Sequence, residues 1–352
     1  MRRLPLYFLL DVSESMVGEP IERVQEGIAT IVRDLRTDPY ALETVYISLL
    51  IFAGKAHRLA PLLELAQFYP PRLPIGSGTS LGAALRLLMD ELDQHVVRAS
   101  AQTKGDWKPL VFLLTDGMPT DDYSAAVSEW QTRFKMRVNL LAIGFGNSAD
   151  AQVLHQLTEH VYRFEDTAPA AYTQFFRWIS QSVKSTSVAV NQGQGDGINL
   201  AKADSELFRN VAVAPTQHQP PLDDRYVVLL AKCQTTHRPY LIKYARVHRS
   251  PDAGLYELNL QTREYQLLGA YGVDQTYFEL SNGREAEAFI DTGELVGFPH
   301  CPHCTNSYGF SLCACGHLFC SGEQPVARCP WCENEMQMSV GDINTAINRT
   351  AG

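Results

Sequence analysis

No apolar run in this sequence approaches the ~18 residues that a helix needs to span a bilayer. The best N-terminal candidate, residues 4–10, runs directly into Asp11, and no small-residue cleavage site follows it. The run therefore predicts a buried strand and not a signal peptide. We expect a protein without a membrane span or an export signal, and the expected compartment is the cytoplasm.

An excess of basic residues is missing as well. The 352 residues carry a net charge of −9, with 18 basic and 21 acidic residues before position 190 and 12 and 18 after it. Because nucleic-acid binding relies on basic residues that neutralise phosphates, nucleic acid is not an expected partner. Hydrophobic residues make up 45% of the chain, which predicts a folded globular protein, and the length predicts two or three domains.

Residues 1–185 alternate apolar runs with amphipathic segments, a pattern typical of βαβ units around a mostly parallel sheet. Strands that are buried on both faces should be almost continuously apolar. The pattern predicts an α/β domain with a doubly wound, mostly parallel sheet. Strands are expected at 4–10, 45–53, 110–115, 138–145 and 161–164, and helices at 21–35, 81–97, 124–134, 149–157 and 172–183.

The second half of the chain has a different pattern. A polar, glycine-rich stretch at 191–197 predicts a linker, with bounds at 186–224. Alternating β-branched and aromatic runs then predict a small antiparallel β module at 225–298. A Cys-rich segment at 299–335 and a tail at 336–352 without a clear signal follow. The strands of the β module are expected at 226–231, 240–247, 255–260 and 276–280.

Hydroxyl and carboxylate side chains follow two of the predicted strands. Asp11, Ser13 and Ser15 come after the first strand, and Asp116 comes after the strand at 110–115. Thr79 lies in a glycine-rich loop before a predicted helix, where Thr79 itself or Ser80 would be the N-cap. Since ligands of open α/β sheets bind at the carboxyl ends of the strands, we expect these side chains to converge.

The converging side chains offer only oxygen donors, which suit Mg²⁺ or Mn²⁺ and disfavour zinc or copper. Because the hydroxyls are neutral, one bound ion would keep an open position that an acidic group of a protein partner can fill. The structural alternative is that these residues are only turn and helix caps. The predicted ligands are Asp11, Ser13, Ser15, Thr79 and Asp116.

The order Asp-x-Ser-x-Ser, then Thr, then Asp resembles the metal-ion-dependent adhesion site of von Willebrand factor A domains. The resemblance covers residues 1–185, including the Thr-Asp-Gly turn at 115–117. It implies a Rossmann-like sheet that binds protein ligands through a shared Mg²⁺.

An enzymatic interpretation uses the same acidic turn. Haloacid-dehalogenase-like phosphatases also place a nucleophilic aspartate after their first strand, but they need a carboxylate two residues later, where this chain has Ser13. The loop at 76–80 lacks the lysine of a phosphate-binding loop. We therefore expect a protein that is not an enzyme, with a metal-dependent phosphohydrolase as the alternative.

Seven of the eight cysteines crowd into residues 301–332, where Cys-x-x-Cys pairs bracket a central group that includes His317. Thiolates and imidazole are the ligands of structural tetrahedral zinc, and eight donors divide into two closed sites. Two zinc ions are expected, with one ion as the alternative count. The candidate ligands are Cys301, Cys304, Cys313, Cys315, His317, Cys320, Cys329 and Cys332.

The pairing of these zinc ligands stays open at this point. Either the two Cys-x-x-Cys pairs share one ion and the central four residues hold the other, or the ligands interleave. Cys233 lies in an apolar strand and is expected to be a core residue, and His300 and His303 are expected to be exposed neighbours.

The Cys-rich run at 315–332 also resembles a RING finger, but Glu323 stands where that family needs a cysteine. A zinc-finger regulator of the ubiquitin-ligase type is therefore a further alternative. A von Willebrand factor A domain joined to such a module is more similar to TerY-type proteins. That resemblance implies a non-enzymatic adaptor of bacterial tellurium-resistance and stress-response systems, with a protein kinase and a metal-dependent protein phosphatase as partners.

Overall fold

The chain forms two compact units, Met1–Leu73 with Thr79–Pro221 and Leu222–Gly352 with Pro74–Gly78. The first unit is α/β and the second is mostly β. The structure is a computed structural model, and it describes residues 2–102, 104–145, 151–164, 169–191, 200–201, 209–210, 225–247, 264–282, 288–338 and 345–350.

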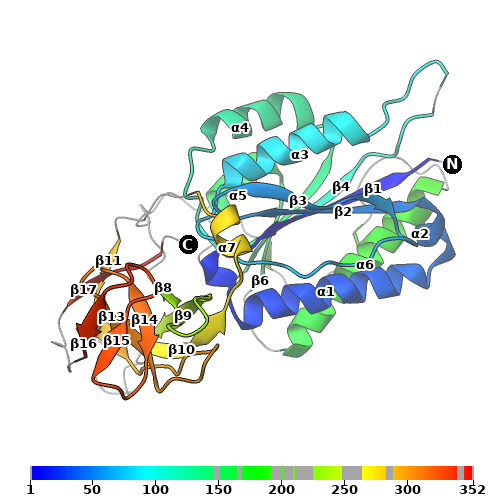
Figure 1. The fold of residues 1–352 in the computed structure, drawn as a ribbon. Helices are drawn as coiled ribbons and strands as arrows, with labels where there is room; N and C mark the ends of the chain where they lie inside the picture. Colours follow the sequence, from blue (N-terminus) through cyan, green and yellow to red (C-terminus); the bar gives the residue numbers. More distant parts are fainter. Residues whose placement is uncertain are drawn as a thin grey trace, which may run out of the picture. The chain divides into compact units, whose positions relative to one another are not determined.

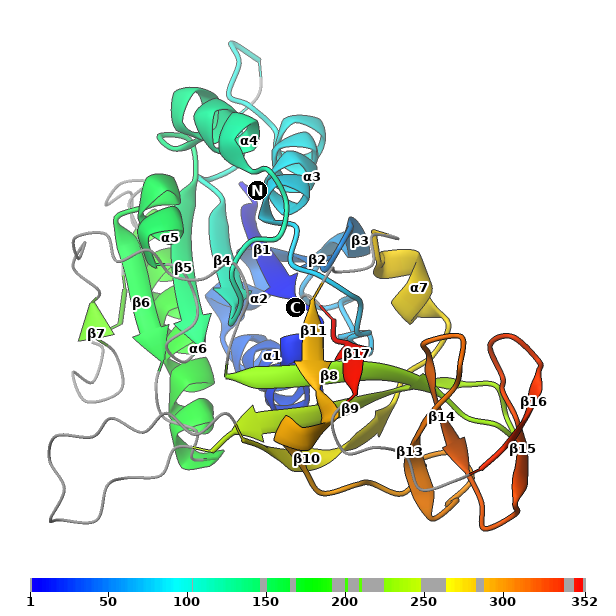
Figure 2. The same ribbon diagram turned by 90° about the vertical axis from the view of Figure 1, so that its left-hand side faces the viewer.

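The first unit is built on a seven-stranded sheet of order β3-β2-β1-β4-β5-β6-β7, which Figure 2 shows from one edge to the other. The five inner strands are parallel, and the edge strands β3 and β7 are antiparallel to their neighbours. β1, β4 and β5 are buried at every position, as the continuous apolar runs predict. The strands are β1 Leu4–Asp11, β2 Val45–Phe52, β3 Ala56–Glu64, β4 Leu110–Thr115, β5 Asn139–Phe145, β6 His160–Phe164 and β7 Arg209–Asn210.

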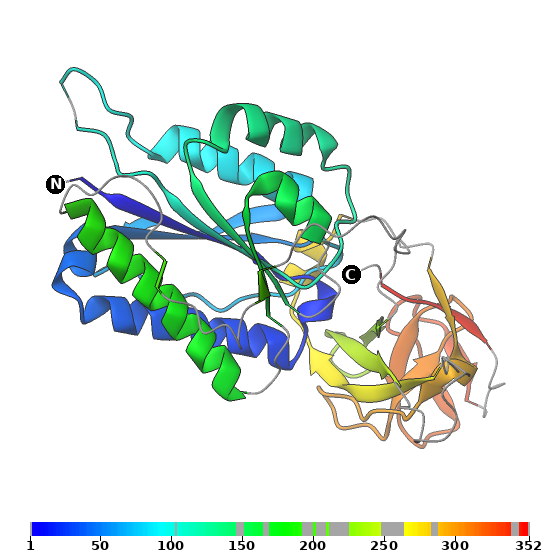
Figure 3. The same cartoon turned by 180° about the vertical axis from the view of Figure 1, so that it is seen from behind.

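Helices cover both faces of this sheet (Figures 1 and 3). α1, α2 and α6 lie together on one face, and α3, α4 and α5 pack on the other in a shared apolar core. The predicted doubly wound α/β fold is confirmed. The helices are α1 Glu19–Arg36, α2 Pro39–Thr44, α3 Leu81–His95, α4 Ser124–Glu129, α5 Ala151–Leu157 and α6 Pro169–Asn191, and α4 continues into a short π-helical turn, Trp130–Phe134.

Two features of the first unit differ from the sequence-based expectation. The strand β3 was not predicted because it is an edge strand in which only Ala60 is buried, so it lacks the continuous apolar run of the inner strands. The helix α6 continues to Asn191, so the start of the expected linker at 186 lies inside a helix. Most of the remaining linker lies outside the described residues.

The second unit contains a six-stranded sheet of order β12-β10-β9-β8-β14-β13 and two small two-stranded sheets, β11-β17 and β15-β16. Buried tyrosines tie the large sheet to the loops beside it, because Tyr240 Oη donates to the Gly309 carbonyl at 2.6 Å and Tyr244 Oη donates to the Gly297 carbonyl at 3.1 Å. The strands are β8 Tyr226–Lys232, β9 Pro239–Arg246, β10 Tyr265–Gly272, β11 Phe289–Asp291, β12 Leu295–Val296, β13 Tyr308–Leu312, β14 Leu318–Ser321, β15 Val326–Arg328, β16 Glu335–Gln337 and β17 Ala346–Asn348.

The structure corrects the expected division of this second unit. β14 of the Cys-rich segment pairs with β8, so the expected β module and zinc segment share one sheet. Ile347 of the expected tail is buried in the same core. The expected strand at 276–280 is instead the helix α7, Thr276–Leu280, where the Asp274 carboxylate accepts a hydrogen bond from Thr276 N at 3.0 Å. The expected strand at 255–260 lies outside the described residues.

The close packing of α1 on α6 gives a test of the fold. A Cβ added at Gly27 of α1 would lie 2.2 Å from ring atoms of the buried Phe176 in α6. We expect Gly27→Ala to lower the free energy of unfolding by about 1–3 kcal/mol through overpacking, although alanine favours the helix. Urea unfolding measures this loss. In a double-mutant cycle, Phe176→Leu should recover part of it, whereas strictly additive effects would show that the two residues are not in contact.

Candidate metal centres

The predicted oxygen ligands lie at the carboxyl edge of the sheet in the first unit. β1 and β4 are parallel neighbours with Leu10 opposite Leu114, so Asp11 at the end of β1 lies beside Asp116, which follows β4. Ser15 lies in a 3₁₀ turn, Glu14–Met16, directly after β1. All five side chains are at most 6% exposed. The five are Asp11, Ser13, Ser15, Thr79 and Asp116.

A chain of hydrogen bonds joins four of these side chains. Ser13 N donates to Asp11 Oδ1 at 2.9 Å, the Oγ atoms of Ser13 and Ser15 are 3.0 Å apart, and Ser15 Oγ donates to Asp116 Oδ1 at 2.7 Å. Thr79 Oγ1 and Asp11 Oδ2 both lie within 4 Å of the position that a Cβ on Gly117 would occupy. The structure therefore brings the predicted residues together around Gly117, which has no side chain to fill the space between them.

The chemistry of this oxygen cluster fits a divalent cation. Within the described residues, the buried Thr79 Oγ1 has no hydrogen-bond partner. Burial raises the pKa of Asp11, and the like charge of Asp116 raises it further, while hydrogen bonds from Thr115 and Ser13 oppose the shift. A buried hydroxyl without a partner and two buried carboxylates that repel each other are what a bound Mg²⁺ or Mn²⁺ would satisfy.

The loop after β4 also fixes the loop that carries Thr79. Thr120 Oγ1 accepts a hydrogen bond from Thr79 N at 2.9 Å, and Thr120 N donates to the Thr79 carbonyl at 2.8 Å. The Asp121 carboxylate accepts from Gly82 N and Ala83 N at the start of α3. The sequence analysis missed Thr120 and Asp121 as positioning residues, because backbone pairing between two loops leaves no spacing signal.

Ser80 occupies the N-cap position of α3, and it is one of the two residues that the sequence predicts there. Its hydroxyl does not cap the helix, and instead donates to the Gly54 carbonyl at 2.9 Å. Thr79 and Ser80 are therefore adjacent buried hydroxyls with different surroundings, since only the Ser80 hydroxyl is used by the fold.

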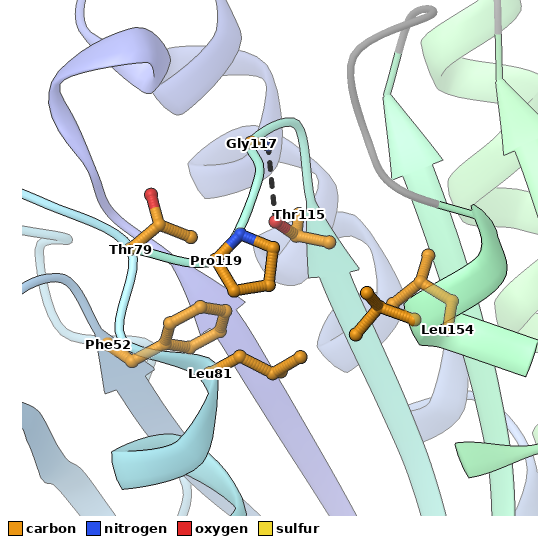
Figure 4. A pocket seen from close by; sticks show the side chains of 8 residues that line it. Phe52, Thr79, Leu81, Thr115, Gly117, Pro119 and Leu154 are labelled. Atoms are coloured by element: carbon orange, nitrogen blue, oxygen red, sulfur yellow. Dashed lines mark hydrogen bonds between the residues drawn. The ribbon is translucent and has the colours of Figure 1, made fainter. Parts of the chain in front are cut away.

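A small pocket lies between these loops (Figure 4). Thr79 and Thr115 are its polar side chains, and the Thr115 hydroxyl accepts a hydrogen bond from Gly117 N at 3.3 Å. An apolar lining next to the carboxylates lowers the local dielectric and strengthens their interaction with any bound cation. The lining residues are Phe52, Thr79, Leu81, Thr115, Gly117, Pro119, Val153 and Leu154.

The cysteines of the second unit form two groups of four, and in each group all the sulfur atoms lie within 4.8 Å of one another. We call the first group the inner cluster and the second the outer cluster. Both have the donors of a structural Cys₄ zinc site. The inner cluster consists of Cys233, Cys301, Cys304 and Cys320, and the outer cluster consists of Cys313, Cys315, Cys329 and Cys332.

These groups correct two expectations about the ligands. Cys233, expected to be only a core residue, lies with Cys301, Cys304 and Cys320, and it replaces His317 as the eighth donor. The His317 ring instead stacks on Trp331, with ring centroids 4.7 Å apart. The two clusters interleave along the chain. Of the two ligand pairings that the spacing left open, the structure therefore has the interleaved one.

Cys233 was missed because it has no neighbouring cysteine in the sequence and directly follows β8, far from the Cys-rich run. A shared turn geometry marks it as a ligand. The carbonyl oxygens of Cys233, Cys301 and Cys329 each accept a hydrogen bond from the residue four positions later, and each of these later residues has a positive φ. The later residues are His237, Thr305 and Glu333. Counting all eight cysteines as two sets of four would have included Cys233 and excluded His317, but it would not have given the grouping.

The sulfur environments fit a bound cation. Burial raises the pKa of Cys301 to about 11 and also raises the pKa of Cys320. Four thiolates at close range are therefore unfavourable without a divalent ion that compensates their charge. The Cys320 sulfur also accepts a hydrogen bond from Gln234 N at 3.2 Å, which orients it in the cluster.

Comparison with known families gives a match for each part of the chain. Residues 6–177 match the von Willebrand factor type A domain, and residues 223–352 match the TerY-C metal binding domain. The chain is thus a von Willebrand factor A protein with a C-terminal metal-binding domain. The two matches together give the architecture of TerY-type proteins, as the sequence resemblance predicts.

Individual relatives are distant. The chain is 24% identical over 156 residues to inter-alpha-trypsin inhibitor heavy chain H1 of Bos taurus, which covers 43% of this chain and 17% of that protein. Among solved structures it is similar to the ArnB paralog VWA2 of Sulfolobus acidocaldarius, with 18% identity, a TM-score of 0.38 and coverage of 53% of this chain and 45% of that chain. It is also similar to the von Willebrand factor type A protein of Catenulispora acidiphila, with 15% identity and a TM-score of 0.38. That match covers 52% of this chain and 43% of that chain. The chain spans less than half the length of each of these proteins.

One further comparison concerns membranes. Among the described residues, no helix combines the length and apolarity needed to cross a bilayer.

The revised ligand set predicts different metal contents for two variants. Cys233→Ser should lower the zinc content from two ions per chain to one, because the inner cluster loses a thiolate, whereas His317→Ala should leave two. Elemental analysis after removal of loosely bound metal measures the counts. The opposite result, with zinc lost only in His317→Ala, would restore the set of seven cysteines and one histidine.

The raised pKa of Asp11 predicts a pH dependence of stability. Without a cation, the folded protein binds more protons than the unfolded chain between the ordinary aspartate pKa of about 3.9 and the raised pKa. The free energy of unfolding should therefore increase as the pH falls through this window, and decrease as it rises. Thermal unfolding of Mg²⁺-free protein across this range, compared with Asp11→Asn, measures the effect.

In that comparison, the pH-dependent part of the free energy of unfolding should be smaller in Asp11→Asn than in the wild type. Saturating Mg²⁺ should weaken it in the wild type, since the ion favours the ionised carboxylate. Identical pH profiles for the wild type and Asp11→Asn would assign the dependence to other groups.

Proposed function

We propose that this protein is a non-enzymatic interaction adaptor that binds a protein partner through a Mg²⁺ or Mn²⁺ ion at the edge of its α/β sheet. The observation that carries the proposal is the buried oxygen cluster, in which two carboxylates are joined through serine hydroxyls while Thr79 Oγ1 has no hydrogen-bond partner within the described residues. The residues that would hold the ion are Asp11, Ser13, Ser15, Thr79 and Asp116.

The charge of this cluster supports a partner that supplies a carboxylate. Three of the five donors are neutral hydroxyls, so the site would leave the ion short of negative charge. The bound ion would supply a coordination position that a partner aspartate or glutamate completes. The chain's own residues fix the oxygen positions, and mostly apolar side chains line the pocket beside Thr79.

The hydrogen bonds of Asp11 support binding over hydrolysis. Oδ1 accepts from Ser13 N, and Oδ2 accepts from the Thr115 hydroxyl at 2.5 Å. Both oxygens of the candidate nucleophile are therefore engaged, and the position two residues later holds Ser13, which offers no carboxylic proton. A metal-dependent phosphohydrolase remains the alternative, and a phosphate-ester assay on the purified chain distinguishes the two.

The cysteine clusters support a structural role for zinc in the second unit. Closed Cys₄ sites stabilise a fold and leave no open position for water or substrate. Their ligands begin at Cys233 in the large sheet, so the Cys-rich run is not a self-contained RING finger. We propose a cytoplasmic location, where reducing conditions keep thiolate clusters intact.

The cellular setting is proposed from the TerY-type architecture. We place the adaptor in a bacterial tellurium-resistance or stress-response system linked to phosphorylation. A protein kinase and a metal-dependent protein phosphatase of the same system are the first candidate partners to test. Each would have to present an accessible carboxylate to the Mg²⁺ site.

Adjacent hydroxyls give a matched test of the Mg²⁺ site. Thr79→Ala removes the hydroxyl without a partner, so we expect Mg²⁺ affinity to fall on the order of 10-fold or more and the melting temperature to stay unchanged. Ser80→Ala removes the hydrogen bond to Gly54, so it should cost about 1 kcal/mol of stability and leave Mg²⁺ affinity unchanged. Titration calorimetry and thermal unfolding measure both quantities.

Partner capture follows the same pattern. Capture by the wild type should require Mg²⁺ and should be lost in Thr79→Ala and Asp116→Asn but kept in Ser80→Ala. If folded Thr79→Ala and Asp116→Asn proteins capture the same partner without Mg²⁺, the oxygen cluster is only structural and the interaction surface lies elsewhere.

A further inference from the structure

The two cysteine clusters differ in their exposure. In the inner cluster, Cys233, Cys301 and Cys320 are at most 2% exposed, and Cys304 is half-buried. In the outer cluster, Cys315 is exposed and Cys332 is half-buried. Small reactants in solution therefore reach outer sulfur atoms more easily than inner ones.

The surroundings of the clusters also differ. Three inner cysteines belong to the core of the large sheet, together with residues of β8, β9 and β14. The Cys320 sulfur also accepts hydrogen bonds from Gln234 N and from Asn306 Nδ2. The outer cluster contributes Cys313 and Cys329 to a separate small core with Phe319 and Ala327.

The chain segments held by each cluster differ in the same way. The inner ligands connect the end of β8, the turn 301–304 and β14, so the inner ion would hold the large sheet together. Of the outer ligands, Cys313 and Cys315 lie in the turn between β13 and β14, and Cys329 and Cys332 lie in the turn of the short hairpin of β15 and β16. Loss of an outer ion would release this hairpin while the large sheet keeps its own ligands.

We propose that the outer cluster is an oxidation site at which peroxide-type oxidants convert thiolates to disulfides and release the zinc ion, while the inner cluster keeps its ion. This inference rests on the proposal that both clusters hold zinc. Susceptibility to oxidation follows thiolate character and exposure. Cys315 is the exposed cysteine of the outer cluster, and a bound zinc ion would hold its sulfur as a thiolate. The outer cluster is then a redox-sensitive structural element, and the inner cluster is a permanent one.

The chemistry balances for each pair of sulfur atoms. The Cys315 thiolate attacks one oxygen of hydrogen peroxide, the O–O bond breaks, and a sulfenic acid and hydroxide form. A second thiolate of the outer cluster attacks this sulfur, so that a disulfide forms and a second hydroxide leaves. Two thiolates are oxidised by two electrons, one peroxide is reduced, and the zinc ion loses two ligands. Cys329 Sγ, 3.8 Å from Cys315 Sγ, is in place for the second step.

The test uses the full-length protein, whose zinc content is first measured by elemental analysis. Hydrogen peroxide is then added in excess, and a chromogenic zinc chelator follows metal release over time. We expect one zinc ion per chain to leave in a fast phase and the second to leave at least about tenfold more slowly. Mass spectrometry after the fast phase should find disulfides only among Cys313, Cys315, Cys329 and Cys332.

Matched variants assign the fast phase to a cluster. Cys315→His keeps a zinc ligand but removes the exposed thiolate, so it should slow the fast phase about tenfold or more. Cys304→His makes the same change in the inner cluster and should leave the fast phase unchanged. If either variant binds fewer than two zinc ions, alkylation of the wild-type protein shows instead which cluster reacts first. We expect the outer cysteines to be labelled before the inner ones.

The outcomes separate this proposal from its premise. Fewer than two zinc ions in the untreated protein would overturn the occupancy of the clusters. Two ions that leave together, or inner cysteines that are oxidised or alkylated first, would overturn the oxidation proposal and leave the zinc sites in place.

Discussion

The pairing of β1 with β4 is the constraint on which the first unit's chemistry depends. The register that sets Leu10 opposite Leu114 brings Asp11 and Asp116 to the same edge, where both are buried and raise the energy of each other's ionised form. Serine hydroxyls connect the two carboxylates but carry no compensating charge. A site of this kind is costly to the fold unless a cation occupies it. The electrostatic strain and the proposed binding activity therefore have one origin.

The second unit also holds ionisable ligands close together, but its ligands are the softer sulfur atoms of cysteines. Several of its strands are short, with β12 limited to Leu295–Val296 and β15 and β16 to three residues each, so these strands bury little apolar surface. Thiolates held by zinc can replace the missing core, as in other small metal-stabilised modules. Cys233 is important in this respect, because it is the ligand that links the Cys-rich run to the central strands β8 and β9. The cysteine run and the β strands thus form one folding unit and not two.

The sequence predicted the parts of this protein whose signals are local. The oxygen ligands follow continuous apolar strands, and the Cys-x-x-Cys pairs lie within short stretches, so both could be recognised without a structure. Long-range relations could not be predicted. Cys233 is separated from Cys301 by most of the β module, and the pairing of β8 with β14 depends on core packing. His317 has the right spacing for a ligand, but its stacking on Trp331 depends on the fold around it.

The opposite ligand chemistries of the two units have a consequence for regulation. Mg²⁺ prefers carboxylates and hydroxyls and competes poorly for thiolates, whereas zinc prefers the sulfur atoms, so each proposed ion would be directed to its own site in the same chain. The oxygen ligands Asp11, Ser13, Ser15, Thr79 and Asp116 have no group that mild peroxide oxidises, while the outer cysteines do. An oxidant would therefore change the second unit and leave the ligands of the Mg²⁺ site chemically intact. Such a division would let the chain keep its proposed partner-binding chemistry under conditions that remove the proposed structural ion from the other unit.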